Sequence, residues 1–199
     1  AHNLLNQSGT PSEVTALFPP APKPVHEVNW PLSAPPTGAQ TAGDVKFGPE
    51  GASFAGGYLL FPREPWMDLG SAMTLHFEFR QDAPGDMPVL LAHGTWRADG
   101  WFAQILGGEL IIRLPDGDAK GPRIELGRWY SIDFVYDGLM VHLAVDGQWL
   151  KQSGAVLRSV PANCGLFIGN YVMPSKQYAF PGRLRNIKLV NDIAMDVND

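Results

Sequence analysis

The sequence is poor in cysteine, in basic residues and in long apolar runs, and each shortage excludes a class of protein. Cys164 is the only cysteine among 199 residues, so neither an internal disulfide framework nor a multi-cysteine metal site can form. The 15 Lys and Arg are outnumbered by 20 Asp and Glu, and the net charge of -5 gives no basic footprint for nucleic acid. No apolar run approaches the ~20 residues of a membrane helix. We therefore expect no nucleic-acid partner and no membrane insertion.

Common catalytic patterns are missing as well. The chain contains no Ser-His-Asp nucleophile elbow, no phosphate-binding Gly-rich loop and no His-x-x-His metal spacing. What the chain does contain is 22 Gly and 18 Pro beside 45% hydrophobic residues, which favours many turns around a real core. Its length suits one β-rich domain. Prolines crowd residues 1–25, which we interpret as an N-terminal arm or linker before a domain of residues 26–199.

The stretch from Gly127 to Leu150 gives the clearest structural signal. Apolar residues alternate on both sides of Asp137-Gly138, and Asp146-Gly147 follows. This is the pattern of a β-meander with two tight turns. Two-residue turns predict that the buried face pairs Phe134 with Val141, Ile132 with Leu143 and Tyr130 with Val145. The opposite face then pairs Asp133 with His142, next to Lys151, and places Trp149 beside Ala144.

Further alternating or apolar runs predict the other strands, and no segment has helical periodicity. Trp96, Arg97 and Asp99 fall in a loop between two of these runs. The predicted strands are 25–32, 45–47, 52–54, 58–61, 73–80, 88–93, 101–106, 109–114, 166–168 and 184–190. In the hairpin at Gly107-Gly108, Ile105 faces Leu110, which leaves Phe102, Gln104 and Arg113 on the other side. The fold class is therefore all-β, an antiparallel β-sandwich.

Four local patterns then occur in a fixed order. They are Phe54-Ala-Gly-Gly-Tyr-Leu-Leu-Phe-Pro62, the run 66–79, Arg128-Trp-Tyr with Val145-Asp-Gly147, and Leu166-Phe-Ile-Gly169 followed by 180–187. In this order the chain resembles the laminin-G-like, concanavalin A-like jelly-roll domains of the lectin and glucanase superfamily, especially the bacterial ones. The resemblance covers roughly residues 26–192 and implies a fold rather than a ligand. It also places Trp129 in the core.

The resemblance raises calcium as a cofactor, and one residue argues against it. Many relatives hold a structural calcium partly through an acid in the last strand, whereas this chain has Arg185 at the matching position. Calcium needs several hard oxygen ligands, so a guanidinium disfavours the ion there. We expect no cofactor, while Glu27 and Asp192 leave open a calcium site elsewhere.

The superfamily also contains enzymes, and three outward side chains of one strand bear on that alternative. Retaining glucanases need two carboxylates about 5 Å apart, and the Glu-x-Asp-x-x-Glu motif that supplies them is absent. His76, Glu78 and Arg80 form a row that suits a polysaccharide lyase, but the lyase signatures are not found in order. The competing interpretation is a solvated face on which Glu78 pairs with Arg80.

A binding module explains more of the aromatic residues. Sugars are recognised by aromatic rings and planar hydrogen-bonding groups, and several of the six Trp and five Tyr lie where a core does not need them. We expect a non-catalytic carbohydrate-binding, lectin-like or adhesion domain of a secreted, periplasmic or cell-surface protein, with a poly- or oligosaccharide as partner. The alternatives are a protein-interaction module and a lyase or glycoside hydrolase. The candidate contacts are Trp96, Arg97, Asp99, Asn170, Tyr171 and Tyr178 from loops, and His76, Glu78, Arg80, Gln104 and Arg113 from a sheet face.

Overall fold

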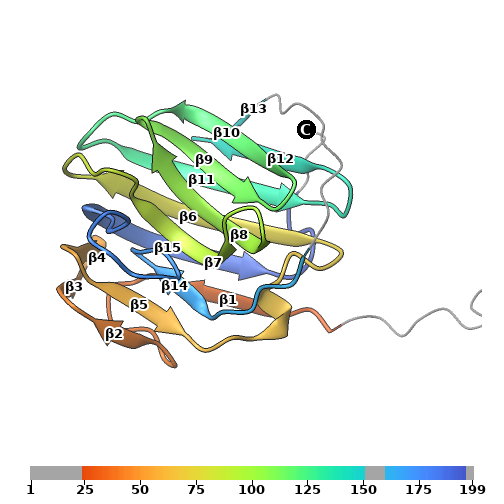
Figure 1. Ribbon diagram of the computed structural model, residues 1–199, viewed down its shortest axis with the longest axis horizontal. Helices are drawn as coiled ribbons and strands as arrows, with labels where there is room; N and C mark the ends of the chain where they lie inside the picture. The colour runs from red at the N-terminus through yellow and green to blue at the C-terminus, as the bar shows by residue number, and fades with distance from the viewer. Residues whose placement is uncertain (1–23, 151–159, 196–199) are drawn as a thin grey trace, which may run out of the picture.

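Two antiparallel sheets pack face to face in the computed structural model, which describes residues 24–150 and 160–195 (Figure 1). The first is eight-stranded, in the order β13-β12-β11-β6-β15-β4-β3 with β1 also paired to β15. It contains β1 (Glu27–Trp30), β3 (Val45–Gly48), β4 (Gly51–Phe54), β6 (Met73–Gln81), β11 (Trp129–Tyr136), β12 (Val141–Val145), β13 (Gln148–Leu150) and β15 (Gly182–Val190).

The second sheet is seven-stranded, in the order β10-β9-β8-β7-β14-β5-β2. It contains β2 (Gln40–Ala42), β5 (Tyr58–Phe61), β7 (Val89–Thr95), β8 (Asp99–Leu106), β9 (Glu109–Leu114), β10 (Gly117–Arg123) and β14 (Leu166–Ile168). The described ranges hold a single helical element, the 3-10 turn η2 (Pro65–Met67), and no helix that is long and apolar enough to cross a membrane. The prediction of an antiparallel β-sandwich is confirmed.

The core lies between the sheets and follows from alternation along each strand. On β6, Met73, Leu75, Phe77 and Phe79 are fully buried, as predicted. The ring of Phe79 stacks on Tyr130 of β11 at 5.4 Å. Burying large aliphatic and aromatic side chains contributes roughly 1.5–3 kcal/mol each. The clean period-two pattern of β6 therefore locates its buried face.

The predicted register of the first hairpin is wrong by two residues. Phe134 lies opposite Leu143 rather than Val141, and Asp133 lies opposite Ala144 rather than His142. The reason is the turn, because the Asp137 carboxylate accepts the backbone N–H groups of Leu139 and Met140 at 2.8 and 2.7 Å. An Asx-type turn of four residues replaces the expected two-residue turn. The buried face is the predicted one, and Trp149 does pair with Ala144, while Lys151 lies outside the described residues.

Trp129 is not a core residue, contrary to the prediction. Its neighbour Tyr130 points inward, so alternation turns the indole to the outer face of the eight-stranded sheet. There the guanidinium carbons of Arg80 and Arg185 lie 5.5 and 4.1 Å from its ring centroid. Cation–π contacts of this kind stabilise by roughly 0.5–1 kcal/mol at exposed sites.

Two strands were not predicted, and their composition explains why. β2 has only three residues, and β10 reads Gly-Asp-Ala-Lys-Gly-Pro-Arg, with the turn-forming and charged residues that strands usually lack. β10 lies at the edge of its sheet, where a proline costs little because that side makes no further ladder. The first strand is also shorter than predicted, and β8 begins at Asp99 instead of Trp101. The residues of the predicted N-terminal arm lie almost entirely outside the described ranges.

Candidate functional site

A pocket of about 270 Å³ opens on the outer face of the seven-stranded sheet. Strands β7, β8 and β9 form its floor, and two loops form its walls: residues 96–98 between β7 and β8, and residues 169–181 between β14 and β15. Its lining residues are Met87, Val89, Trp96, Phe102, Gln104, Leu106, Arg113, Tyr171 and Tyr178. Five of the contacts predicted from the sequence are among them.

The floor of this aromatic pocket follows from the β8–β9 hairpin, whose register is the predicted one. Ile105 pairs with Leu110 and Ala103 with Ile112 in the core. The intervening residues therefore point outward, and Phe102 lies directly opposite Arg113. Gln104 is also on this outer side, where its amide donates to the backbone carbonyl of Met87 at 3.3 Å.

Three aromatic side chains from the loops complete the pocket. The Tyr171 ring meets Phe102 edge-on at 5.2 Å and lies 5.0 Å from the ring of Tyr178. The Tyr171 hydroxyl accepts the backbone N–H of Trp96 at 2.7 Å, which ties the two loops together. Trp96 itself remains 63% exposed. A fixed backbone and an open indole make Trp96 suited to receive the apolar face of a ligand.

Asp99 and Asn170 shape the two loops and do not line the pocket. Asp99 accepts the backbone N–H and hydroxyl of Thr95, both at 2.7 Å, and the amide of Asn163 at 3.2 Å. Burial alone would raise the pKa of Asp99, but these hydrogen bonds outweigh it and lower that pKa. The Asn170 oxygen accepts the N–H groups of Tyr171 and Ser175. Both residues hold neighbours in place, which is a supporting role for the site.

The prediction that His76, Glu78 and Arg80 lie on the same sheet face as Gln104 and Arg113 is wrong. They lie on β6, in the other sheet, where each is paired. His76 bonds to Asp133 at 2.6 Å, and Arg80 donates to Asp82 at 2.6 Å. Glu78 accepts from Arg185 and Asn186 instead of Arg80, at 2.8 and 2.7 Å. These pairs favour the interpretation of this face as a charge-paired sheet surface.

Replacing Asp133 with Asn is expected to lower the pKa of His76. In the folded protein the hydrogen bond with Asp133 raises that pKa above its usual value, against the lowering effect of burial. The pair therefore stabilises the fold fully below about pH 6.5, and this contribution is lost as the pH rises through the raised pKa. Asp133→Asn should cost about 1 kcal/mol at pH 6 and less at pH 9. Titration of the histidine ring protons by NMR measures the pKa, and an unchanged His76 curve would contradict the assignment.

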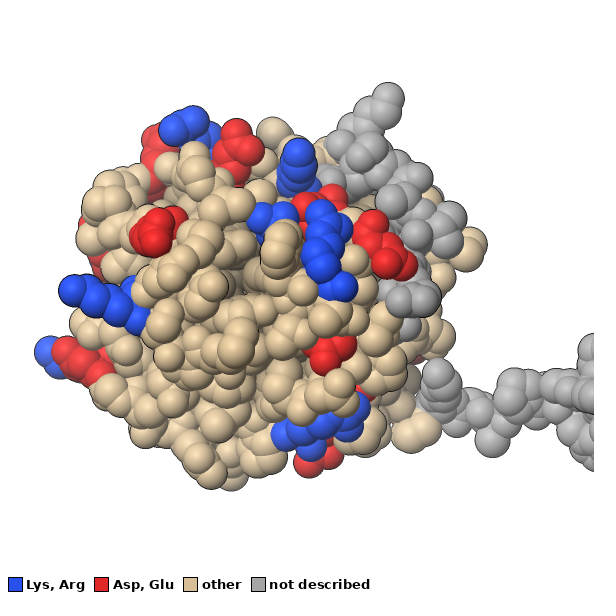
Figure 2. Space-filling view, viewed as in Figure 1, with Lys and Arg blue, Asp and Glu red and all other residues tan. Residues whose placement is uncertain are grey.

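Phe102, Met87, Val89 and Leu106 line the pocket and were not among the predicted contacts. Phe102 could have been predicted from the sequence, because the alternation along β8 puts it on the same side as Gln104 and opposite Arg113. It belongs to a second apolar cluster on the outside of the seven-stranded sheet, made of Val89, Ala92, Phe102, Phe167 and Tyr171, with Tyr58, Leu60, Val172 and Tyr178 packed against it. Figure 2 shows this face as a broad uncharged area with acidic and basic side chains mainly around its rim.

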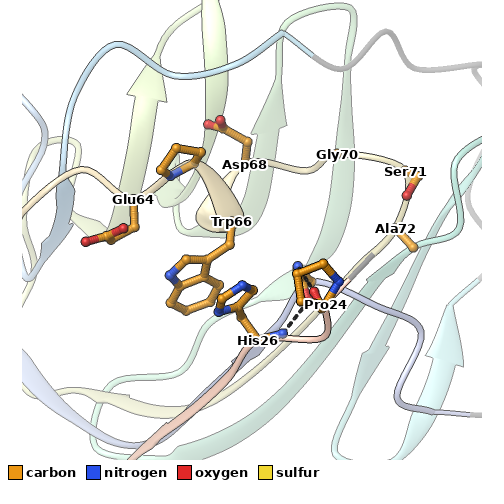
Figure 3. A pocket seen from close by; sticks show the side chains of 10 residues that line it. Pro24, His26, Glu64, Trp66, Asp68, Gly70, Ser71 and Ala72 are labelled. Carbon is orange, nitrogen blue, oxygen red and sulfur yellow. Dashed lines mark hydrogen bonds between the residues drawn. The ribbon is translucent and has the colours of Figure 1, made fainter. Parts of the chain in front are cut away.

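A larger pocket, of about 390 Å³, lies where β1 meets the loop that carries η2 (Figure 3). The Trp66 indole stacks on His26 at 5.6 Å, so one ring face is already covered. The Asp68 carboxylate points away from these rings and bonds to Arg63 and His93. None of the predicted contact residues lines this pocket. The aromatic pocket on the seven-stranded sheet is therefore the stronger candidate.

Among the described residues, no three His, Cys, Asp or Glu side chains are grouped closely enough to hold a metal ion. Arg185, at the position where calcium was disfavoured, pairs with Glu78 and covers Trp129. The aromatic pocket is lined by aromatic and aliphatic side chains, and Gln104 and Arg113 are its polar groups.

Comparison with known proteins finds likeness in fold and not in sequence. No family model and no curated protein matches the chain. A Trypanosoma rangeli sialidase in complex with sialic acid matches with a TM-score of 0.65 and 16% identity, over 83% of this chain and 31% of the sialidase. Botulinum neurotoxin type C, from a study of its interaction with two ganglioside molecules, matches with a TM-score of 0.60 and 10% identity, over 77% of this chain and 43% of the other.

The binding domain of botulinum neurotoxin serotype C1 gives a similar result, with a TM-score of 0.57 and 10% identity. The chain thus spans about a third of the sialidase and under half of the neurotoxin chains. At these identities the likeness establishes the fold alone. The chain is a β-sandwich domain of the kind that these larger proteins contain.

Proposed function

We propose that the chain is a non-catalytic carbohydrate-binding domain and that its site is the aromatic pocket. The observation that carries this proposal is the convergence of Trp96, Tyr171 and Tyr178 with Gln104 and Arg113 from two loops and two strands. Aromatic rings contact the C–H faces of sugars, and planar amide and guanidinium groups bond their hydroxyls. The laminin-G-like assignment and a secreted, periplasmic or cell-surface location belong to the same proposal.

The size of the pocket limits the ligand. Its volume of about 270 Å³ is just below the range of roughly 300–1,000 Å³ that is usual for drug-sized ligands. This suits one sugar ring or the end of an oligosaccharide. Two of the similar structures support the choice of ligand class, since the sialidase is in complex with sialic acid and the neurotoxin is described with gangliosides.

Trp96→Ala is expected to weaken glycan binding by at least about tenfold. Trp96 offers the pocket's most exposed aromatic ring to a ligand. Truncating an aromatic residue at the centre of a binding site to alanine can cost about 2 kcal/mol or more of binding free energy. A glycan array identifies the ligand, and calorimetric titration then compares the variant with the parent. Trp149→Ala, on the opposite sheet, is the matched control and should bind normally. Absence of binding to any glycan, or equal affinity of both variants, would contradict the proposal.

A protein-docking domain is the second candidate, favoured by the apolar cluster outside the seven-stranded sheet. Tyr58 and Leu60 lie on that face beyond the pocket and are only partly buried. Exposed apolar patches commonly mark interaction sites. A protein partner would contact these two residues, whereas a short glycan in the pocket would not, so substitutions there separate the two functions.

A further inference from the structure

A compact ionic cluster adjoins the aromatic pocket. The Asp118 carboxylate, on β10, accepts Arg113 at 2.8 Å and lies 3.4 Å from Arg97. Two guanidinium groups and one carboxylate leave the cluster with one net positive charge, although the whole chain has a net charge of -5. Arg113 lines the pocket, and Arg97 follows Trp96 directly in the loop that forms its wall. The polar side of the pocket is therefore locally cationic.

The hydrogen bonding of this cluster is incomplete. In the part of the chain that the structure describes, four buried side-chain N or O atoms have no partner, and two of them are Arg113 Nε and Asp118 Oδ1. Buried polar atoms are normally satisfied, so a concentration of exceptions calls for a functional reason. Arg97 is 44% exposed at its side chain and offers five N–H donors, of which the 3.4 Å contact uses one. Its remaining donors are available for a planar anion.

The backbone of Arg97 gives an independent observation. Its φ of 59° is in the left-handed region, which glycine and asparagine adopt at little cost and other residues rarely adopt. The other non-glycine residues with positive φ in the described ranges are Leu32, Asp146 and Asn186. Leu32 is buried in the core, so its side chain justifies the conformation. Arg97 has no such packing role and lies at the centre of the turn between β7 and β8, which the N–H of Ala98 closes by donating to the carbonyl oxygen of Thr95 at 3.1 Å. This turn fixes the side chain of Arg97 beside that of Trp96 at the rim of the pocket.

Building on the proposed function, we propose that the pocket binds an acidic sugar whose carboxylate pairs with Arg97 at the rim. Trp96 and Arg97 are consecutive, so one rigid turn presents an indole and a guanidinium side by side. An uronic or nonulosonic acid has both matching parts, a ring with C–H faces and a planar carboxylate. Arginine binds carboxylates through two parallel N–H donors, which selects them over neutral hydroxyl groups.

The test compares a uronic acid oligosaccharide with a neutral hexose oligosaccharide of the same length. The parent protein should bind the acidic probe more tightly, and added salt should weaken that binding and leave the neutral probe unaffected. Arg97→Asn should lower the affinity for the acidic probe about tenfold and leave neutral affinity unchanged. Its melting temperature should not fall, because asparagine tolerates the left-handed conformation. A purely structural role for Arg97 would instead lower the melting temperature and both affinities.

The two proposals fail in different ways. Equal affinity for both probes, with no effect of Arg97→Asn, overturns the acidic-sugar inference. In that case a loss of binding in Trp96→Ala still supports the carbohydrate site. Absence of binding to either probe and to the whole glycan array overturns both.

Discussion

Gly100→Ala is expected to disrupt the β7–β8 hairpin and to abolish binding at the aromatic pocket. Gly100 has a φ of 58° and lies opposite Gly94, whose φ is 146°. A Cβ atom at position 100 would overlap the carbonyl oxygen of His93 and the backbone of Gly94. The obstacles are backbone atoms of two paired strands, which cannot move aside as a flexible side chain can. We expect a loss of roughly 3 kcal/mol or more in the free energy of unfolding, measured by urea denaturation.

Gly107→Ala is the matched control for this effect. Gly107 has nearly the same φ, 60°, but a Cβ atom there would meet nothing within 4 Å. It should therefore cost only the left-handed strain, about 1–2 kcal/mol. Glycan binding by this variant should persist. Equal losses in the two variants would show that strain alone, and not the close approach of β7 and β8, determines the requirement at Gly100.

The alternation of apolar and polar residues made most of the fold predictable. Applied strictly, it would also have corrected the prediction that Trp129 is in the core. The buried sides of β6, β8, β9 and β11 follow directly from period-two patterns. The same rule, applied strictly, places Trp129 outside because Tyr130 is inside. The resemblance to a family motif suggested the opposite. Local side-chain hydrogen bonds were harder to foresee, and the turn at Asp137 shifts the register by two residues from the predicted one.

The candidate site was predictable as a list of residues but not as an arrangement. Trp96 and Tyr171 stood out because no core position required them, yet the contact between them spans 75 residues of sequence. It forms because the loop after β14 lies over β7 and β8, and strand order in a sandwich is not determined by local patterns. Asp118 was missed for a different reason. Its strand, β10, has the composition of a turn and was not predicted as a strand. The position of Asp118 between Arg97 and Arg113 therefore could not be predicted.

Asp68→Ala is expected to cost about 3–5 kcal/mol in the free energy of unfolding. One carboxylate oxygen bonds to His93 at 3.0 Å and to the backbone N–H of Ala162 at 2.8 Å, and the other bonds to Arg63 at 3.0 Å. His93 is fully buried. Removing the carboxylate therefore leaves buried N–H donors without an acceptor. Removing only one partner of a buried interaction is strongly destabilising, because the other partner stays buried and unsatisfied. An exposed ion pair would contribute only about 0–1 kcal/mol, so a loss of that size would contradict the assignment.

The dependence of this effect on pH supplies a second test of the Asp68–His93 pair. Burial lowers the pKa of His93, although Asp68 acts in the opposite direction. Below about pH 6.5, His93 is protonated in the unfolded chain and stays largely neutral in the folded protein. The free energy of unfolding should therefore fall as the pH decreases. Asp68→Asn removes the anion that opposes burial, so its stability should fall more steeply between pH 7 and 5 than that of the parent.

The ring of Trp101, 6.2 Å from His93, offers a fluorescence signal for the unfolding curves. His93 directly precedes Gly94, and Ala162 is next to the residue that bonds to Asp99. A change at Asp68 should therefore also weaken the turn that carries Trp96 and Arg97. If stability falls while glycan affinity of the remaining folded protein is unchanged, the Asp68 cluster supports the sandwich but not the geometry of the pocket.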